Sequence, residues 1–469
     1  MTADQDREET PEKNGGTPLC VSVDGALIPT SLASEALFRL IGTDFLTLLK
    51  LPFWFLGGRT RVNKEVASRI HLNDAELPYN EPLLEFLRGE HAEGRAIVLV
   101  TTAPENLVTP ISERLGVPAD VIASTPERSI IRQYLGPVLF ERFGPKGFDY
   151  VGDLRPNDDL RKSAREVLAM GTSERPGLPA ILEAMRVDQW LKNILIFLPL
   201  LADQSFNEPP RVFAALLAFV VFSLAASGVY LVNDLLDPDA DRLHPTKRRR
   251  PLASGRLRLS TAPGLVLLLE GTAVGLAAIF LPLGFLGVLA GYLVMTTLYS
   301  LRLKGVVLVD VLVLAGLYTL RVVAGAAATG ITLSMWLLAF SMFLFLSLAL
   351  VKRYGELFAV ISAGLAEERL PARSYRKDDL PILVSLGTAS GYLSVLVLAL
   401  YIVGGEAAQR YSAFGLIWLL CPLLLYWISR AWIVVGRHQL HGDPLVWAVR
   451  DRISRWVALI ALVIVFFAQ

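Results

Sequence analysis

The chain has 469 residues, of which 53% are apolar, and its formal net charge is +1 at pH 7. The near-zero net charge gives no indication of a nucleic-acid partner, and the apolar content is too high for a typical soluble protein. Apolar stretches long enough to span a bilayer recur only from about Leu195 onward. The composition therefore predicts a soluble part of roughly 175 residues followed by a membrane part of roughly 290.

Residues 1–17 are predicted to form a disordered tail. The opening stretch MTADQDREETPEKNGG is polar and acidic, and it lacks the basic start and apolar core of a signal peptide. Cys20 lies in the soluble part and Cys421 in a spanning segment, so no disulfide is expected.

Residues 18–170 alternate short apolar runs with helical stretches. The runs PLCVSVDGALI, AIVLVTT and FDYVGD are typical of buried parallel strands. This alternation predicts an α/β domain with a Rossmann-type parallel sheet.

The ends of these runs, VDGAL, VTT and GDLRPND, resemble the motifs of the haloacid dehalogenase (HAD) superfamily. The resemblance matches Asp24, Thr101 (or Thr102), Asp153 and Asp158 to motif positions, but the nucleophilic and metal-binding Asp is replaced by Ser22. The motif lysine has no clear match. Because that family transfers phosphoryl groups through an aspartyl phosphate, the domain is predicted to be HAD-like but not an active phosphatase. A structural, regulatory or binding role is expected, with an altered ligand site as the alternative.

The stretch 42–58, GTDFLTLLKLPFWFLGG, is unusually apolar for this domain. The first interpretation is a buried cap helix, and the alternative is an amphipathic patch that rests on the bilayer or docks on the membrane part. Residues 171–185 contain Gly and Pro and are predicted to be the linker.

Residues 186–469 are predicted to form an all-α, polytopic membrane domain. Nine candidate spans lie near 190–206, 211–233, 262–281, 283–301, 306–328, 332–351, 381–403, 413–435 and 453–469. Basic loops alternate with loops poor in Lys and Arg, so the positive-inside rule places the N-terminal domain in the cytoplasm and the C-terminus across the cytoplasmic (inner) membrane.

The second predicted span ends in an acidic cluster followed by a basic one. Asn233, Asp234, Asp237 and Asp241 recur at spacings of three and four, which share one face of a helix, although Pro238 predicts a kink or a restart. Oxygen ligands of this kind suit Mg²⁺, and the Lys and Arg residues at 247–250 suit phosphate. The pattern predicts a Mg²⁺–diphosphate site; the alternative is an ordinary acidic helix end with a basic stop.

The segments NDLLDPDAD and HPTKRRRPLASG resemble the first signature of the UbiA family of intramembrane prenyltransferases. That resemblance implies a fold of nine transmembrane helices around a lipid-accessible cavity and an enzyme that uses Mg²⁺. The second signature of the family is rich in aspartate, whereas this chain has only Asp310 at that place, so the usual scheme of two metal clusters is in doubt.

The segments RVDQWLKN, YSLRLKGVVLVD, KRYGEL and GDPLVWAVRDR most resemble one UbiA branch, the polyprenyl-phosphate phosphoribosyltransferases. This implies transfer of 5-phosphoribose from phosphoribosyl pyrophosphate (PRPP), a soluble cytosolic donor, to an isoprenoid lipid phosphate in the bilayer, with diphosphate as leaving group. The lipid product would serve cell-envelope biosynthesis as a precursor of lipid-linked arabinose. The alternative is transfer of a prenyl group from a prenyl diphosphate to an aromatic or other acceptor.

The resemblance implies roles for individual residues. Asp234, Asp237 and Asp241 are expected to hold Mg²⁺, and Asp310 is expected to be a second-site ligand or a ribose partner. Donor or acceptor binding is assigned to Asn233, Lys247, Arg250, Lys192, Asn193, Tyr299, Lys304, Arg321, Lys352 and Arg353.

Two other classes are weighed against an enzyme. A transporter is disfavoured because the ionisable residues cluster at one membrane face and no inverted repeat is visible. A regulatory protein built from two inactive enzymes is disfavoured by the intact acidic and basic clusters. A homo-oligomer is compatible with the sequence.

Overall fold

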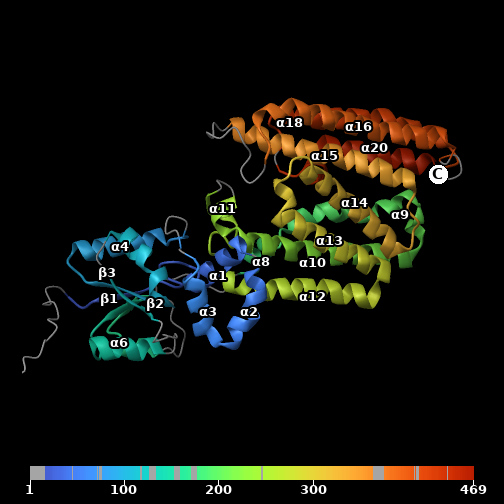
Figure 1. Ribbon diagram of the computed structural model, residues 1–469. Helices are drawn as coiled ribbons and strands as arrows, with labels where there is room; N and C mark the ends of the chain where they lie inside the picture. Colours follow the sequence, from blue (N-terminus) through green and yellow to red (C-terminus); the bar gives the residue numbers. More distant parts are fainter. Residues whose placement is uncertain are drawn as a thin grey trace, which may run out of the picture. The chain divides into compact units, whose positions relative to one another are not determined.

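The computed structural model describes residues 16–44, 46–70, 72, 77–116, 119–125, 134–152, 159–168, 170, 177–243, 247–362, 374–405, 407, 411–440 and 442–468. The chain divides into two compact units: residues 1–185 with 230–266, and residues 186–229 with 267–469. Helices α10 and α12 contribute residues to both (Figure 1).

The first unit contains a five-stranded sheet in the order β3-β2-β1-β4-β5, in which all paired neighbours are parallel. The strands are β1 (Leu19–Ser22), β2 (Ile97–Pro104), β3 (Ala119–Ser124), β4 (Asp149–Val151) and β5 (Val167–Leu168). The predicted parallel sheet is therefore confirmed. The central strand β1 lies where the strand order reverses, and the crevice at such a switch point commonly holds a ligand.

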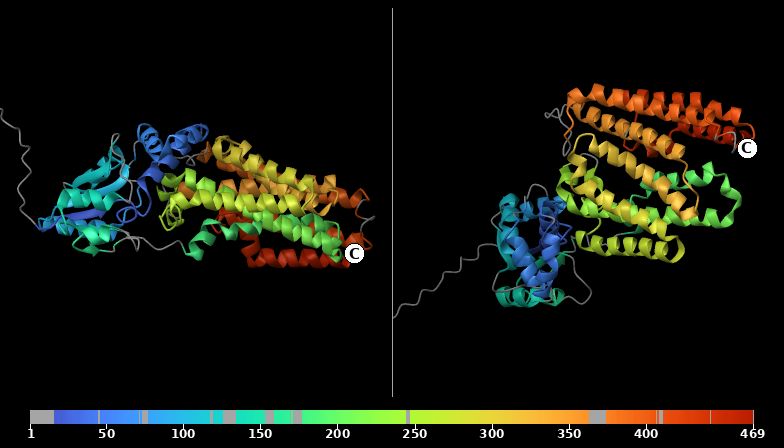
Figure 2. Two further views of the ribbon diagram at one scale, coloured as in Figure 1. Left: turned by 90° about the horizontal axis from the view of Figure 1, so that it is seen from below. Right: turned by 45° about the vertical axis from the view of Figure 1, so that its right-hand side comes forward.

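Both faces of the sheet are covered. Leu19 and Val21 of β1 point into one apolar core, and Cys20 between them points into another. Figures 1 and 2 show helices packed against the strands. The helices of this unit before the membrane part are α1 (Leu32–Thr43), α2 (Thr47–Leu56), α3 (Gly58–Ala67), α4 (Glu81–Ala92), α5 (Thr109–Leu115), α6 (Leu135–Phe143), α7 (Leu160–Ser163) and α8 (Leu178–Ala184).

Helix α2 does not form the buried cap expected as the first interpretation of stretch 42–58. Leu49, Phe53 and Leu56 are 70%, 66% and 85% exposed, and only Thr47 and Trp54 of this helix are buried. The segment is apolar on nearly every side, so packing one side necessarily leaves the others uncovered.

The second unit is a bundle of long apolar helices that run side by side (Figures 1 and 2). Within the described residues, seven helices have the length and composition to cross a membrane. The helices of the membrane part are α9 (Leu198–Ala202), α10 (Pro209–Leu236), α11 (Pro238–Leu243), α12 (Ala262–Phe280), α13 (Leu283–Leu301), α14 (Val309–Thr329), α15 (Met335–Ser362), α16 (Leu380–Val403), α18 (Leu420–Gly436), α19 (Pro444–Arg450) and α20 (Arg452–Ala468).

The predicted count of nine spans is not confirmed. The predicted span at 190–206 is a 3₁₀ segment, Val187–Phe197, followed by the five-residue α9, and Gln204 then takes a left-handed conformation (φ 60°). The predicted span at 453–469 is the 17-residue α20. The 3₁₀ segment lies unusually close to α14, since a Cβ on Gly325 would come within 1.9 Å of the Ile196 carbonyl oxygen.

Candidate functional site

The acidic cluster lies where α10 ends and α11 begins, which confirms the break expected at Pro238. Asp234 occupies the last turn of α10, and Asp241 lies in α11. The amide of Asp237 donates to the Asn233 carbonyl, and the amide of Asp241 donates to the Asp237 carbonyl, so the two helices join through one continuous turn. We call residues 233–243 the acidic turn.

Arg250 bridges the two buried carboxylates of the acidic turn. Its Nη1 lies 3.1 Å from Oδ1 of Asp234 and 2.6 Å from Oδ2 of Asp241. The two aspartates are 5% and 6% exposed, whereas Asp237 is exposed. The guanidinium therefore supplies the positive charge that two close carboxylates require in a partly buried place.

The acidic turn brings two carboxylates, those of Asp234 and Asp241, within reach of one cation site, and their oxygens are donors that suit Mg²⁺. Both carboxylates reach the same Nη1 atom, so a single small cation could contact both. Among the described residues, no three Asp, Glu, His or Cys side chains converge on one point. Mg²⁺ is commonly held by one or two carboxylates, with water and substrate phosphates completing its shell. The predicted basic partner Lys247 is half-buried in a short 3₁₀ turn, and His244, Pro245 and Thr246 lie outside the described residues.

In the second unit, Asp310 and Arg353 are paired with each other. Nη2 of Arg353 lies 2.7 Å from Oδ2 of Asp310, and both side chains are fully buried. The Tyr375 hydroxyl donates to the other Asp310 oxygen at 2.6 Å, and Arg353 also pairs with Glu356. Burial and the bond to Asp310 raise the pKa of Tyr375, which keeps it a neutral donor. The two side chains that the sequence assigned to ligands are therefore engaged with each other.

A further carboxylate, that of Asp443, lies close to two of the predicted phosphate-binding lysines. Its Oδ2 lies 2.8 Å from Nζ of Lys192 and 3.5 Å from Nζ of Lys352, and it accepts from the Tyr318 hydroxyl at 2.8 Å. Burial opposes ionisation of Asp443, but the charges of Lys192 and Lys352 hold its pKa well below the usual range.

Asp443 was given no role from sequence. Its side chain accepts from the amide of Leu445 and caps α19, and an Asp followed by Pro at the start of a helix is a signal that could have identified it.

Arg321 and Asn193 are brought together as a second polar pair in the same unit. The Nε of Arg321 donates to the Asn193 amide oxygen at 2.8 Å, and Asn193 donates to Ser223. The guanidinium also lies 5.2 Å from the centroid of the Tyr292 ring, a cation–π contact. The remaining predicted residues are only partly buried: Tyr299 near the end of α13 and Lys304 in the following 3₁₀ turn.

At the end of β1 in the first unit, the motif residues contact one another. The Asp24 carboxylate accepts from the Thr101 hydroxyl at 2.6 Å and from the Leu32 amide at 2.8 Å. The Ser22 hydroxyl donates to the Asp24 carbonyl at 2.9 Å. Asp153 and Asp158 lie outside the described residues.

Comparison with protein families assigns the membrane part. The UbiA prenyltransferase family matches residues 194–444, which is more than half of the chain. The chain belongs to the UbiA family. As a UbiA protein it is a multi-pass membrane transferase, and its matched region includes the acidic turn, Asp310 and Asp443.

Similar proteins differ in how much of the chain they match. An uncharacterized protein (y4nM) of Sinorhizobium fredii is 32% identical over 95% of this chain and 90% of its own length, so the similarity includes the N-terminal unit. Two others align with less of the chain. The nodulation protein NoeC of Azorhizobium caulinodans is 35% identical over 57% of this chain and 86% of its own. A decaprenyl-phosphate phosphoribosyltransferase of Mycobacterium tuberculosis is 32% identical over 61% of this chain and 94% of its own.

Among solved structures, a UbiA homolog from Archaeoglobus fulgidus bound to GPP and Mg²⁺ aligns with a TM-score of 0.46 at 18% identity, covering 62% of this chain and 98% of that one.

Proposed function

We propose that this membrane transferase moves 5-phosphoribose from PRPP to a polyprenyl phosphate. The observation that carries the proposal is the 32% identity to the decaprenyl-phosphate phosphoribosyltransferase of Mycobacterium tuberculosis, which extends over 94% of that enzyme. In this reaction the bond between the anomeric carbon and diphosphate breaks, and an oxygen of the lipid phosphate bonds to that carbon. Diphosphate leaves, and nothing is oxidised or reduced.

The acidic turn is the proposed donor site. Asp234 and Asp241 would hold Mg²⁺, which when bound supplies positive charge to stabilise the leaving diphosphate. Arg250 is then no longer needed to neutralise the carboxylates, and its guanidinium can bind diphosphate oxygens. Asp237, exposed between the two, is placed to hold a metal-bound water.

Lys192, Lys352 and Arg321 are the proposed partners of the phosphate of the acceptor or of the 5-phosphate of the donor. Nζ of each lysine lies close to one carboxylate, that of Asp443, and an ammonium group carries three N–H donors. In the same unit, an apolar cavity of about 210 Å³ lies among α15, α16 and the start of α18, lined by residues such as Leu337, Phe340 and Leu424. Such a lining suits an isoprenoid chain.

The test is a transfer assay in detergent with the full-length protein, Mg²⁺, a polyprenyl phosphate and radiolabelled PRPP. We expect label in the lipid fraction, abolished by Asp237→Ala and retained by Asp378→Ala, a matched change of an exposed aspartate. Near-wild-type transfer by the Asp237 variant would refute that residue's role.

The family's description as prenyltransferases supports a second candidate, transfer of a prenyl group to an aromatic acceptor. Folded protein that ignores PRPP but joins a prenyl diphosphate to such an acceptor would establish it instead.

For the N-terminal domain, we propose a HAD-like fold without phosphatase activity. The proposal is supported by Ser22 at the end of the central strand and by the engagement of Asp24 with Thr101 and Leu32. The full-length protein should not hydrolyse p-nitrophenyl phosphate with Mg²⁺. Hydrolysis that Asp24→Asn removes would overturn this assignment.

The basic loops support a cytoplasmic N-terminal domain and a C-terminus on the far side of the inner membrane. Cysteines introduced at Glu85 and Phe467 should react with an impermeant maleimide from opposite sides of the membrane. Labelling of both from one side would contradict this orientation.

A further inference from the structure

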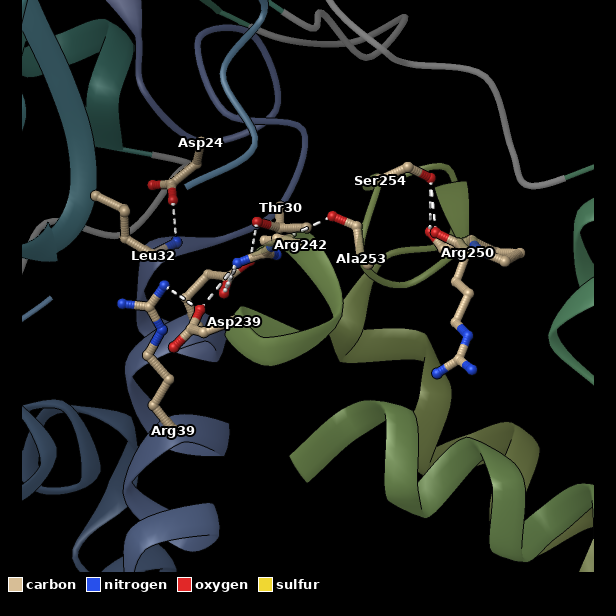
Figure 3. A network of polar contacts seen from close by, with 11 residues as sticks. Asp24, Thr30, Leu32, Arg39, Asp239, Arg242, Arg250, Ala253 and Ser254 are labelled. Carbon is tan, nitrogen blue, oxygen red and sulfur yellow. Dashed lines mark hydrogen bonds and ion pairs between the residues drawn. The ribbon is translucent and has the colours of Figure 1, made fainter. Parts of the chain in front are cut away.

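Two charged residues of helix α1 contact the acidic turn directly. The Glu35 carboxylate accepts from both terminal nitrogens of Arg242, at 2.7 and 3.0 Å, and Nη2 of Arg39 pairs with Oδ1 of Asp239 at 2.5 Å. Figure 3 shows this network between α1 and α11, whose partners are about two hundred residues apart in sequence. We call these four residues the α1–α11 cluster.

The α1–α11 cluster is largely buried, so its charged side chains are favourable only when they are paired with one another. The side chains of Glu35, Arg39 and Arg242 are 0%, 6% and 8% exposed. Unpaired charges are strongly unfavourable in such surroundings. Displacing α11 from α1 would leave several buried charges without a partner. The Thr30 hydroxyl donates to Glu35, and Nε of Arg242 donates to the Ala253 carbonyl, which fixes both ends of the central pair.

The α1–α11 cluster brackets a proposed metal ligand. Asp239 and Arg242 lie on either side of Asp241 in the six-residue α11. Holding these two neighbours fixes the backbone from which the Asp241 carboxylate reaches Arg250. Helix α1 also approaches the end of α10 closely, since a Cβ on Gly42 would come within 2.5 Å of the Leu236 carbonyl oxygen.

The other end of α1 is anchored at the end of strand β1. The Asp24 carboxylate accepts from the amide of Leu32, the first residue of α1, and is itself held by Thr101. An unbroken path of contacts within one unit thus leads from the HAD-like motif residues through α1 to the acidic turn.

We propose that the N-terminal domain positions the acidic turn of the transferase through Glu35 and Arg39, and that this is its contribution to the reaction. Both are positioning residues, because through Arg242 and Asp239 they hold the helix that carries Asp241. The Mg²⁺ titration that tests this inference rests on the proposed Mg²⁺-dependent transfer. The hydrogen-exchange measurement rests on the structure alone.

The chain offers a matched control. Glu183 also makes a two-pronged pair with an arginine of the loop that follows α11, Arg256, with both distances 2.8 Å. Both side chains of this pair are 48% exposed, and exposed pairs contribute little. Glu35→Gln and Glu183→Gln each remove a carboxylate charge that pairs with an arginine, the first from a buried pair and the second from an exposed pair.

The experiment titrates Mg²⁺ in the transfer assay and measures hydrogen exchange of residues 237–243 without substrate. Outer-shell partners of a metal ligand commonly alter metal affinity about 10–100-fold. For Glu35→Gln we expect at least about a tenfold higher Mg²⁺ concentration for half-maximal rate, a smaller change in kcat at saturating Mg²⁺, and faster exchange in α11. Glu183→Gln should match the wild type in all three.

Wild-type Mg²⁺ dependence and exchange in a folded Glu35→Gln protein would overturn the positioning role. If that variant does not fold, Arg39→Gln, which removes the contact with the partly exposed Asp239, is measured in its place with the same expectations. If the wild type fails to use PRPP, the proposed function falls, while the exchange comparison still decides whether α1 holds α11.

The exposed apolar side of helix α2 supports a second, independent proposal. Leu46, Leu49, Phe53 and Leu56 are each at least 62% exposed, and Lys50 beside them is also exposed. The preceding helix α1 contacts the end of α10, a helix of membrane-spanning length. Exposed bases follow in α3 at Arg61 and Lys64. We propose that α2 lies in the surface of the bilayer, with these bases among anionic headgroups.

The test uses Phe53→Cys and, as control, Glu85→Cys on the polar side of α4, each labelled with an environment-sensitive dye in proteoliposomes of anionic lipid. Lipids carrying a doxyl quencher should quench the dye at position 53 and leave the dye at position 85 unaffected. Equal quenching at both positions would contradict the placement of α2 in the bilayer surface. A dye at position 53 that is shielded from water but not quenched by the lipid would also contradict it, and would indicate a protein partner such as a second copy.

Discussion

Two carboxylate–arginine clusters of this protein differ in what surrounds them. In the acidic turn, Arg250 joins Asp234 and Asp241 and its side chain is 28% exposed. In the second unit, Arg353 joins Asp310 and neither side chain is exposed at all. The Arg250 guanidinium is accessible to a ligand from solvent. If Arg353 left its partner, the buried charge of Asp310 would remain unpaired. We therefore expect the first pair to serve ligand binding and the second to serve stability.

Loss of the buried Arg353 charge should affect the free energy of unfolding most strongly. Arg353→Met leaves the Asp310 charge buried and unpaired, so it should lower the free energy of unfolding by about 3–5 kcal/mol. Denaturation in detergent, followed by circular dichroism, measures the change. Adding Asp310→Leu to this variant should recover much of the loss, because well-packed apolar pairs can replace buried ion pairs. An Arg353→Met protein as stable as the wild type would contradict a structural role.

In the acidic turn the main effect should be on rate. Removing a group that stabilises transition-state charge commonly costs about 10²–10³ in kcat. Asp241→Ala should therefore reduce transfer by at least about a hundredfold while changing the denaturation midpoint little, because Arg250 retains access to solvent. Initial rates and melting curves of the same preparation separate the two. If Asp241→Ala strongly lowered the stability of the protein but reduced the transfer rate only slightly, the acidic turn would have a structural role instead.

A smaller, pH-dependent effect is expected at Asp443, whose pKa Lys192 and Lys352 lower against the opposing effect of burial. A carboxyl group whose pKa is depressed by folding stabilises the protein above its unfolded pKa of about 3.9, and this contribution is lost as the pH falls through the folded pKa. The difference in unfolding free energy between the wild type and Asp443→Asn should therefore be constant above about pH 5 and shrink below pH 4. A difference that does not vary over this range would contradict the ion pairs.

The smallest expected effect concerns Cys20 in β1. Burial raises the pKa of its thiol to about 12, and the residue is fully buried. Because the thiolate is the reactive form, the folded protein should show no labelling of Cys20 by a maleimide at pH 8, whereas the urea-unfolded protein should react. Mass spectrometry of the labelled peptide measures this, and labelling in the folded state would show that the sheet opens.

The parallel sheet and the break at Pro238 could be predicted from sequence because both depend on local patterns, apolar runs and a proline. The count of nine spans is not confirmed, because the segment 190–206 is a 3₁₀ segment followed by the five-residue α9; its close approach to Gly325 is not encoded in a hydropathy pattern. The spacing of Asp234 and Asp241 indicated the acidic turn. Their partner Arg250, and the buried pairing of Asp310 with Arg353, depend on which helices pack together, and no spacing encodes that.

The most direct test of the account is a crystal structure of the full-length protein soaked with Mn²⁺ and PRPP, with anomalous scattering used to locate the metal. We expect an anomalous peak between Asp234 and Asp241, with Arg250 turned to the diphosphate and with the Asp310–Arg353 pair intact. A peak beside Asp310, or none at the acidic turn in protein that binds PRPP, would contradict it.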